Sequence, residues 1–184
     1  MPELTEKSVP HHKSVFISDF ATIAEKYQRR LVAIAYRMLG NFEDARDSVQ
    51  EVLVKFLKTN KLRSSEHEIF QLLTRILVNF CIDQLRKRKV WRFFSFTESG
   101  VDSLPGRNPD PDQEINRSEL NALLEKKIDK LKPRQKAIYI LRDVEGYSVR
   151  ETANLVGCSE NSVLANLHLA RQNLRKWLKP YLQE

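Results

Sequence analysis

The chain has few of the residues that interrupt or cross-link a polypeptide. Its 184 residues include five glycines, seven prolines and two cysteines. Glycine and proline are the strongest helix breakers, whereas leucine, isoleucine, lysine, arginine and glutamate are abundant here. This composition predicts an all-α protein.

The two cysteines, Cys81 and Cys158, each fall within a helical or turn pattern. They could form a redox pair, or bind a metal together with His11 and His12. No ligand spacing supports either idea, so we predict structural thiols and no metal site.

Long apolar runs are absent as well. No segment approaches the roughly 20 apolar residues that a membrane span needs, and the N-terminal segment MPELTEKSVPHHKS lacks the apolar core of a secretion signal. We therefore expect a cytoplasmic protein without membrane insertion. Basic residues outnumber acidic ones by 31 to 24, a net charge of +7. This balance favours a polyanionic partner.

The hydrophobic periodicity predicts two small helical domains joined by a linker. Residues 1–14 are polar and predicted to be disordered, and the domains are expected at residues 15–96 and 117–184. The linker, residues 97–116, has three of the seven prolines, two of the five glycines and five acidic residues against one basic residue. Helices are expected at residues 18–39, 42–58, 66–92, 118–131, 133–143, 148–156 and 160–178.

The segment from Ser148 to Arg175 has the pattern of a helix-turn-helix. Ser148 and Glu151 form a capping signature, Gly157 permits a turn, and Ser159 can cap the second helix. An ordinary helical hairpin is the alternative, whereas a DNA-binding unit would lay its second helix in the major groove. The candidate DNA-contacting residues are Ser159, Glu160, Asn161, Ser162, Leu164, Ala165, Asn166, His168 and Arg171.

The helix expected from Phe42 carries acidic residues opposite an apolar face. Its candidate partner-docking residues are Asp44, Asp47, Gln50 and Glu51. This could be a solvated face or a docking surface for a basic partner. Acid catalysis or metal binding is weakly supported, because no histidine or cysteine stands nearby in the sequence.

The helix expected from residue 66 ends in five basic residues within seven, followed by aromatic residues. Cations neutralise phosphates, amide and guanidinium groups read base edges, and aromatic rings stack on unpaired bases. The candidate nucleic-acid residues are Arg75, Asn79, Asp83, Arg86, Lys87, Arg88, Lys89 and Arg92. A solvated helix end is the alternative for the cations, and core packing is the alternative for Phe93, Phe94 and Phe96.

These motifs, in this order, resemble the extracytoplasmic-function (ECF) group of bacterial sigma factors, the minimal two-domain initiation factors of RNA polymerase. AYRMLGNFEDARDSVQEVLVKFL resembles the part of sigma region 2 that docks on the clamp helices of the largest polymerase subunit. LTRILVNFCIDQLRKRKVWR resembles the segment that melts and reads the minus-ten element. The stretch from Leu131 to Arg175 resembles region 4, which reads the minus-thirty-five element.

The resemblance implies a non-enzymatic factor that binds core RNA polymerase and promoter DNA, with an anti-sigma factor as a further partner. It implies no cofactor and no small-molecule substrate. Because the chain ends soon after Pro180, we expect no appended C-terminal sensory domain. A stand-alone helix-turn-helix regulator with a sensing or dimerisation domain, and a metal-dependent enzyme of nucleic acids, are the rival interpretations.

The expected recognition helix departs from the family pattern. Ser162 to Asn166 reads SVLAN where the family usually has a run like Thr-Val-Lys-Ser-Arg, and Leu169 stands at a usual basic position. We hypothesise that the protein reads an atypical upstream element, or binds it weakly and depends on the minus-ten contacts.

Overall fold

A computed structural model describes residues 11–58, 65–98 and 119–181, and every regular element in these ranges is a helix. The predicted all-α class is confirmed. An N-terminal unit contains α1 (His11–Leu39), α2 (Phe42–Leu57) and α3 (Glu66–Glu98). A C-terminal unit contains α4 (Glu119–Ile128), α5 (Pro133–Tyr139), the π-helix η1 (Ile140–Val144), α6 (Val149–Val156), α7 (Glu160–Leu178) and the short 3₁₀-helix η2 (Lys179–Tyr181).

Several helix boundaries differ from the prediction, and α4, predicted to reach residue 131, ends at Ile128. α1 begins at His11 instead of Ser18, so residues 11–14 are helical and not disordered. α3 continues to Glu98, into the predicted linker, because no glycine or proline precedes Gly100 to end it. The helix that begins at Pro133 changes at Ile140 to a π-helix, in which the Glu145 N–H donates to the Ile140 carbonyl at 2.9 Å. Residues 1–10 and 99–118 lie outside the described ranges.

Local capping signals place the C-terminal end of α1 and the starts of α2 and α3 as predicted. Gly40 ends α1 with a φ of 74°, a conformation that glycine adopts without strain. The Asn41 side chain accepts the Asp44 N–H at 3.1 Å and so caps α2. At the start of α3, the Glu68 carboxylate accepts the Ser65 N–H at 2.8 Å. Hydrogen bonds from Ser65 lower the pKa of Glu68.

The N-terminal unit buries the apolar faces that the periodicity predicts. α1, α2 and α3 contact one another pairwise, and each contributes side chains that are 3% exposed or less. These side chains are Leu31, Ile34, Ala35 and Met38 of α1, Ala45, Val49, Val52 and Phe56 of α2, and Ile69, Leu73 and Leu77 of α3. The acidic side of α2 is therefore left facing outward.

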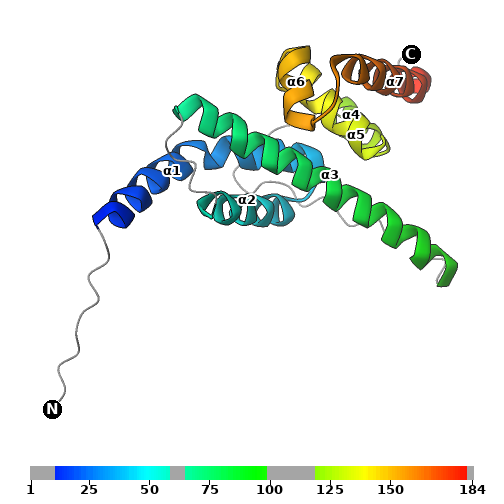
Figure 1. Cartoon of the computed structure of the whole chain (residues 1–184). Coiled ribbons are helices and arrows are strands. Elements are labelled where there is room, and N and C mark those ends of the chain that lie inside the picture. Colours follow the sequence, from blue (N-terminus) through cyan, green and yellow to red (C-terminus); the bar gives the residue numbers. More distant parts are fainter. Residues whose placement is uncertain (1–10, 59–64, 99–118, 182–184) are drawn as a thin grey trace.

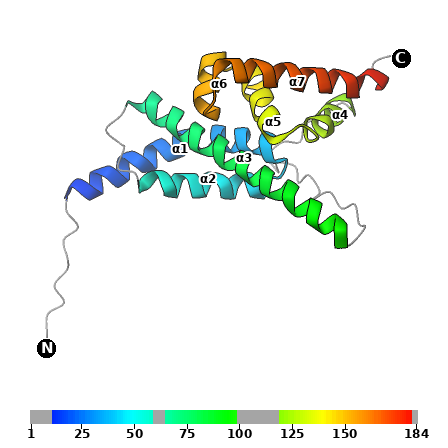
Figure 2. The same ribbon diagram turned by 45° about the vertical axis from the view of Figure 1, so that its right-hand side comes forward.

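The two units pack against each other. In both views α2 lies on one side of α3, and the helices of the C-terminal unit lie on the other side (Figures 1 and 2). α3 contacts both α5 and α6, and one cluster contains buried side chains of both units. Leu131, Ala170 and Leu174 form a second, smaller cluster within the C-terminal unit. The last turns of α3 project beyond α1 and α2 (Figure 1). Hydrophobic periodicity could not show this packing, because it does not say which faces of distant helices meet.

The cysteines fit the predicted structural role to different degrees. Cys81 is fully buried, and burial raises the pKa of its thiol to about 12, so it is inert at neutral pH. Cys158 is half-buried, and both thiols are free. Among the described residues, no three His, Cys, Asp or Glu side chains come together to hold a metal ion. The described helices also include none that could cross a membrane.

Candidate nucleic-acid interface

The acidic face of α2 consists of Asp44, Asp47, Gln50 and Glu51. Asp47, Gln50 and Glu51 are exposed, whereas Asp44 is half-buried. Glu51 forms an ion pair with Lys55 one turn along the helix, with 2.7 Å between Oε1 and Nζ. Within the described residues, Asp47 is the exposed carboxylate of this face without such an ion pair, and it is best placed to meet a basic surface.

Arg88 joins the acidic face to α3. Its Nη2 lies 2.7 Å from Oδ2 of Asp44, and its Nη1 donates to the Leu39 carbonyl at 3.3 Å. Only 28% of its side chain is exposed. Arg88 was predicted to bind DNA, but in this structure its guanidinium fastens the end of α1 and the start of α2 to α3.

The cationic end of α3, which we define as Arg86, Lys87 and Lys89 with Trp91, projects into solvent. Arg86, Lys87 and Lys89 are exposed, and Trp91 is 77% exposed. Arg86 also pairs with Asp83 at 3.0 Å, a weak exposed ion pair one turn apart. The side chains of Arg92, Phe93, Phe94 and Phe96 lie outside the described residues, so the alternative of core packing for those aromatics stays open.

The polar stripe that precedes the cationic end lies partly under the C-terminal unit. Asn79 is half-buried, and its Nδ2 donates to the Arg75 carbonyl at 2.8 Å and to the Leu155 carbonyl of α6 at 2.9 Å. Arg75 is exposed and lines a cavity between the units. The stripe is therefore continuous in sequence but divided in space. The C-terminal unit covers Asn79, whereas Arg86 is exposed beyond it.

The helix-turn-helix has the predicted local geometry. Ser148 and Glu151 form a reciprocal capping box, with bonds of 2.7 Å and 3.2 Å. Hydrogen bonds from the Ser148 side chain and N–H to the carboxylate lower the pKa of Glu151. Gly157 turns the chain with a φ of 68°, and the Ser159 hydroxyl accepts the Ser162 N–H at 3.2 Å. The buried side of α7 consists of Val163, Leu167, Ala170 and Leu174.

The outer side of α7 presents two large apolar side chains. Leu164 is 51% exposed and Leu169 is 45% exposed. Asn166 is half-buried, and its amide Nδ2 donates back to the Ser162 carbonyl at 2.8 Å. The remaining predicted contact residues that are exposed are Ser159, Glu160, Asn161, Ala165, His168 and Arg171.

Arg171 is the first cation of α7, and it is held by Asp143. Nε donates to Oδ2 at 2.9 Å and Nη2 to Oδ1 at 2.6 Å, a bidentate arrangement that raises the pKa of Arg171. Sequence reasoning did not find Asp143, because it stands 28 residues earlier with no motif to connect the two. The pair leaves α7 with fewer free phosphate anchors than its sequence indicates.

Both halves of the chain match parts of one known family. Residues 23–90 match Sigma-70 region 2, and residues 121–174 match Sigma-70 region 4. The chain is 30% identical over 163 residues to the ECF RNA polymerase sigma factor SigE of Mycolicibacterium smegmatis. The chain belongs to the ECF sigma factors. The acidic face of this sigma factor and the cationic end of α3 lie in its region 2, and the helix-turn-helix lies in its region 4.

The relatives differ in length. The match to SigE covers 88% of this sigma factor and 62% of SigE. The ECF RNA polymerase sigma factor SigW of Bacillus subtilis is 24% identical over 185 residues, with 97% of this chain and 99% of SigW covered. The sigma factor RpoE of Bartonella quintana, solved as a co-crystal with the anti-sigma factor NepR, has a TM-score of 0.57 over 93% of this chain and 98% of that chain, at 22% identity. This likeness shows the shared fold.

Proposed function

We propose that the protein binds core RNA polymerase, directs it to specific promoters in the cytoplasm and helps open the DNA, and that it does so by binding and without catalysing a reaction. One observation carries the proposal. An exposed acidic face and a projecting cationic helix end occur on the same three-helix unit, bridged by Arg88 and Asp44. A surface for a basic protein and a surface for DNA are thereby held at a fixed distance from each other.

Docking depends on the acidic face. Asp47 and Glu51 would meet basic side chains of polymerase, and Gln50 between them can donate and accept hydrogen bonds. Electrostatic complementarity of this kind accelerates association and fixes the orientation of the complex. The apolar side of α2 is buried inside the unit, which keeps the acidic side outward.

DNA opening depends on α3. Arg86, Lys87 and Lys89 neutralise backbone phosphates, and the exposed Trp91 ring offers a stacking platform for a base that has left the duplex. Extruding a base costs a few kcal/mol, and stacking contributes about 1–3 kcal/mol per base. Stacking on Trp91 therefore roughly offsets the free-energy cost of extruding one base, so the free energy of polymerase binding decides whether the DNA opens.

Upstream recognition would be largely apolar. Leu164 and Ala165 are exposed near the start of α7, whereas the Asn166 amide is already bonded to Ser162. In the major groove, an aliphatic side chain discriminates thymine through its methyl group. This supports the hypothesis of an atypical upstream element that contains thymines opposite Leu164.

In vitro transcription with purified core polymerase tests the proposed function. We expect the protein to produce defined transcripts from a subset of promoters in a genomic fragment library, with start sites that share one minus-ten sequence. Core polymerase without the protein is the control. The stand-alone regulator is the alternative interpretation. It predicts no association with core polymerase in a pull-down, and that result together with absent transcripts would refute the proposal.

Charge reversal separates docking from DNA binding. We expect Asp47→Arg to weaken binding to core polymerase at least tenfold, because an exposed carboxylate becomes a repelling cation. Glu25→Arg makes the same change at an exposed site on α1 and should leave binding unchanged. Function that needs no metal would argue against the enzyme interpretation. Regulation by an anti-sigma factor stays a prediction from the resemblance.

A further inference from the structure

A cavity of about 530 Å³ lies where α1, α3 and α6 meet. Its lining comes from Arg30 of α1, from residues between His67 and Arg75 of α3, and from the C-terminal unit between Glu145 and Leu155. Cavities of roughly 300–1,000 Å³ that combine apolar walls with a few polar groups are typical binding sites for small molecules. With the exception of Arg75, no residue of this lining belongs to the surfaces proposed above to bind polymerase or DNA.

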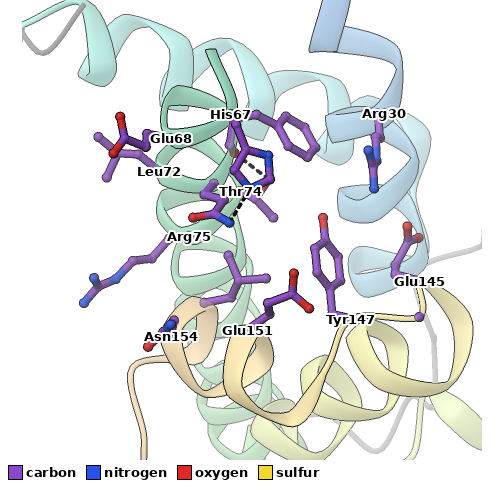
Figure 3. Close-up of a pocket in the computed structure, with 14 residues that line it drawn as sticks. Arg30, His67, Glu68, Leu72, Thr74, Arg75, Glu145, Tyr147, Glu151 and Asn154 are labelled. Atoms are coloured by element: carbon purple, nitrogen blue, oxygen red, sulfur yellow. Dashed lines mark hydrogen bonds between the residues drawn. The ribbon is translucent and has the colours of Figure 1, made fainter. Parts of the chain in front are cut away.

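The Tyr147 hydroxyl points into this cavity from the C-terminal unit (Figure 3). Its oxygen is shielded from solvent and has no hydrogen-bond partner among the described residues. Thr74 lies nearby, but its hydroxyl donates to the Phe70 carbonyl at 2.8 Å. Burial is the main cause that raises the pKa of Tyr147, so the phenol keeps its proton at neutral pH. Because buried polar groups normally form hydrogen bonds, this hydroxyl can donate to an acceptor inside the cavity.

Arg30 supplies a cation on the α1 side of the cavity. Its guanidinium lies over the Phe70 ring, 4.7 Å from the ring centroid, and Phe70 stacks on Tyr27 at 4.5 Å. Among the described residues, Arg30 forms no ion pair. It is close enough to Tyr147 for its charge to oppose the rise in the pKa of the phenol. The aromatic contact therefore holds the guanidinium in place and leaves its N–H donors available.

Three carboxylates line the same cavity, and each one already has a partner. Glu68 and Glu151 accept backbone N–H groups of their own helix caps, at 2.8 Å and 2.7 Å. Glu145 pairs with Arg37 of α1, and only 11% of the Glu145 side chain is exposed. The negative charges of the lining are thus engaged within the protein, whereas its cations are left for a ligand.

We propose that this cavity binds a small organic anion, whose carboxylate or phosphate group lies between the Arg30 guanidinium and the Tyr147 hydroxyl. A guanidinium presents parallel N–H groups that match two oxygens of either anion. Leu72 and Leu155 also line the cavity, so the ligand carries an apolar portion beside its charged group. Arg75 at the rim adds a second positive charge (Figure 3). This site goes beyond the proposed function and does not rest on it.

Ligand-observed NMR on the full-length protein tests the charge of the ligand. The anionic probes are benzoate and phenyl phosphate, and the control is benzamide, which has nearly the shape of benzoate but no charge. We expect saturable binding of at least one anion and about tenfold weaker binding of benzamide. Benzamide that binds as tightly as the anions, or no saturable binding of either anion up to about 10 mM, would overturn the proposal.

Inorganic phosphate tests the apolar portion of the ligand. Burial of the phenyl ring should make phenyl phosphate bind about tenfold more tightly than inorganic phosphate. Equal affinities would contradict the apolar portion and reduce the site to one for the oxyanion alone. The more tightly bound of benzoate and phenyl phosphate shows whether the natural ligand is a carboxylate or a phosphate.

Two substitutions identify the binding groups. Arg30→Gln removes the charge but keeps a planar polar side chain, and Tyr147→Phe removes only the hydroxyl. We expect each to lower the affinity for the anion about tenfold. Arg29→Gln makes the first change at an exposed position of α1 outside the cavity lining, and should bind as the wild type does. Unchanged affinity in both Arg30→Gln and Tyr147→Phe would refute the assigned site.

Thermal melts separate binding from folding. A buried hydroxyl without a partner destabilises the free protein, so Tyr147→Phe should melt at the wild-type temperature or above it. The bound anion should raise the melting temperature of the wild type more than that of Tyr147→Phe. A lower melting temperature for free Tyr147→Phe would show that the hydroxyl has a partner within the protein, against its assignment as an open donor. Neither assay contains polymerase or DNA, so failure of the proposed function would leave both results valid.

Discussion

The two helices of this sigma factor that we propose to contact DNA, α3 and α7, expose different kinds of side chain. α3 ends in exposed cations and an exposed tryptophan that project away from the fold. α7 presents Leu164 and Leu169, and its first cation is held by Asp143. Under the proposed function, the contrast divides phosphate binding and sequence reading between the units, with most of the DNA affinity expected on α3.

Removing the cations of each helix should show the largest difference. We expect the triple substitution of Arg86, Lys87 and Lys89 by alanine to lower the promoter affinity of the holoenzyme about a hundredfold. The slope of log affinity against log salt concentration should also fall, by the amount that corresponds to roughly two to three phosphate contacts. The double substitution of Arg175 and Lys176 by alanine should lower the same promoter affinity tenfold or less. Binding measured across a salt series checks both, and equal losses would break the comparison.

Arg88 distinguishes structural from DNA-binding cations within α3. Because it pairs with Asp44 and the Leu39 carbonyl, we expect Arg88→Ala to lower the free energy of unfolding by about 1–2 kcal/mol. Lys87→Ala, at an exposed neighbouring position, should change stability by less than about 0.5 kcal/mol. Denaturant unfolding measures both variants. An unchanged midpoint for Arg88→Ala would show that the observed contacts do not stabilise the unit.

Replacing thymine by uracil tests apolar reading by α7. Loss of one buried methyl group is worth about 0.8 kcal/mol, so each critical uracil should weaken upstream binding about fourfold. Leu164→Ala should lower affinity for the thymine promoter and abolish the difference between the two bases. Asn166→Ala should matter less, since its amide is engaged with Ser162. A persistent base difference in Leu164→Ala would exclude direct reading by this side chain.

The two capping boxes, one in each unit, are expected to give the smallest effects on stability. We expect Ser148→Ala and Ser65→Ala each to cost about 0.5–1 kcal/mol at pH 7. Their carboxylates, Glu151 and Glu68, have lowered pKa values in the folded protein. The capping contribution is therefore present above the normal carboxyl pKa of about 4.3 and is lost as the pH falls through the lowered value. Thermal melts at pH 7 and pH 3 should show a penalty that shrinks in acid.

The sequence established the features that depend on neighbours within one or two helical turns. Both capping boxes, the positive-φ glycines at Gly40 and Gly157, and the outward acidic side of α2 follow from backbone geometry and helical periodicity. For the same reason, α7 has the predicted bounds of Glu160–Leu178. The order of these motifs was sufficient to indicate the family, and the comparisons confirm it.

Tertiary structure alone decided which of the predicted DNA-binding residues are available. Asn79 meets a carbonyl 76 residues away, Arg37 a carboxylate 108 residues away, and Arg171 one 28 residues away. No periodicity connects such positions, because their approach depends on how two helical units fit together. The sequence by itself predicted two helices that bind DNA. The packing of one unit on the other determined which side chains each helix leaves exposed.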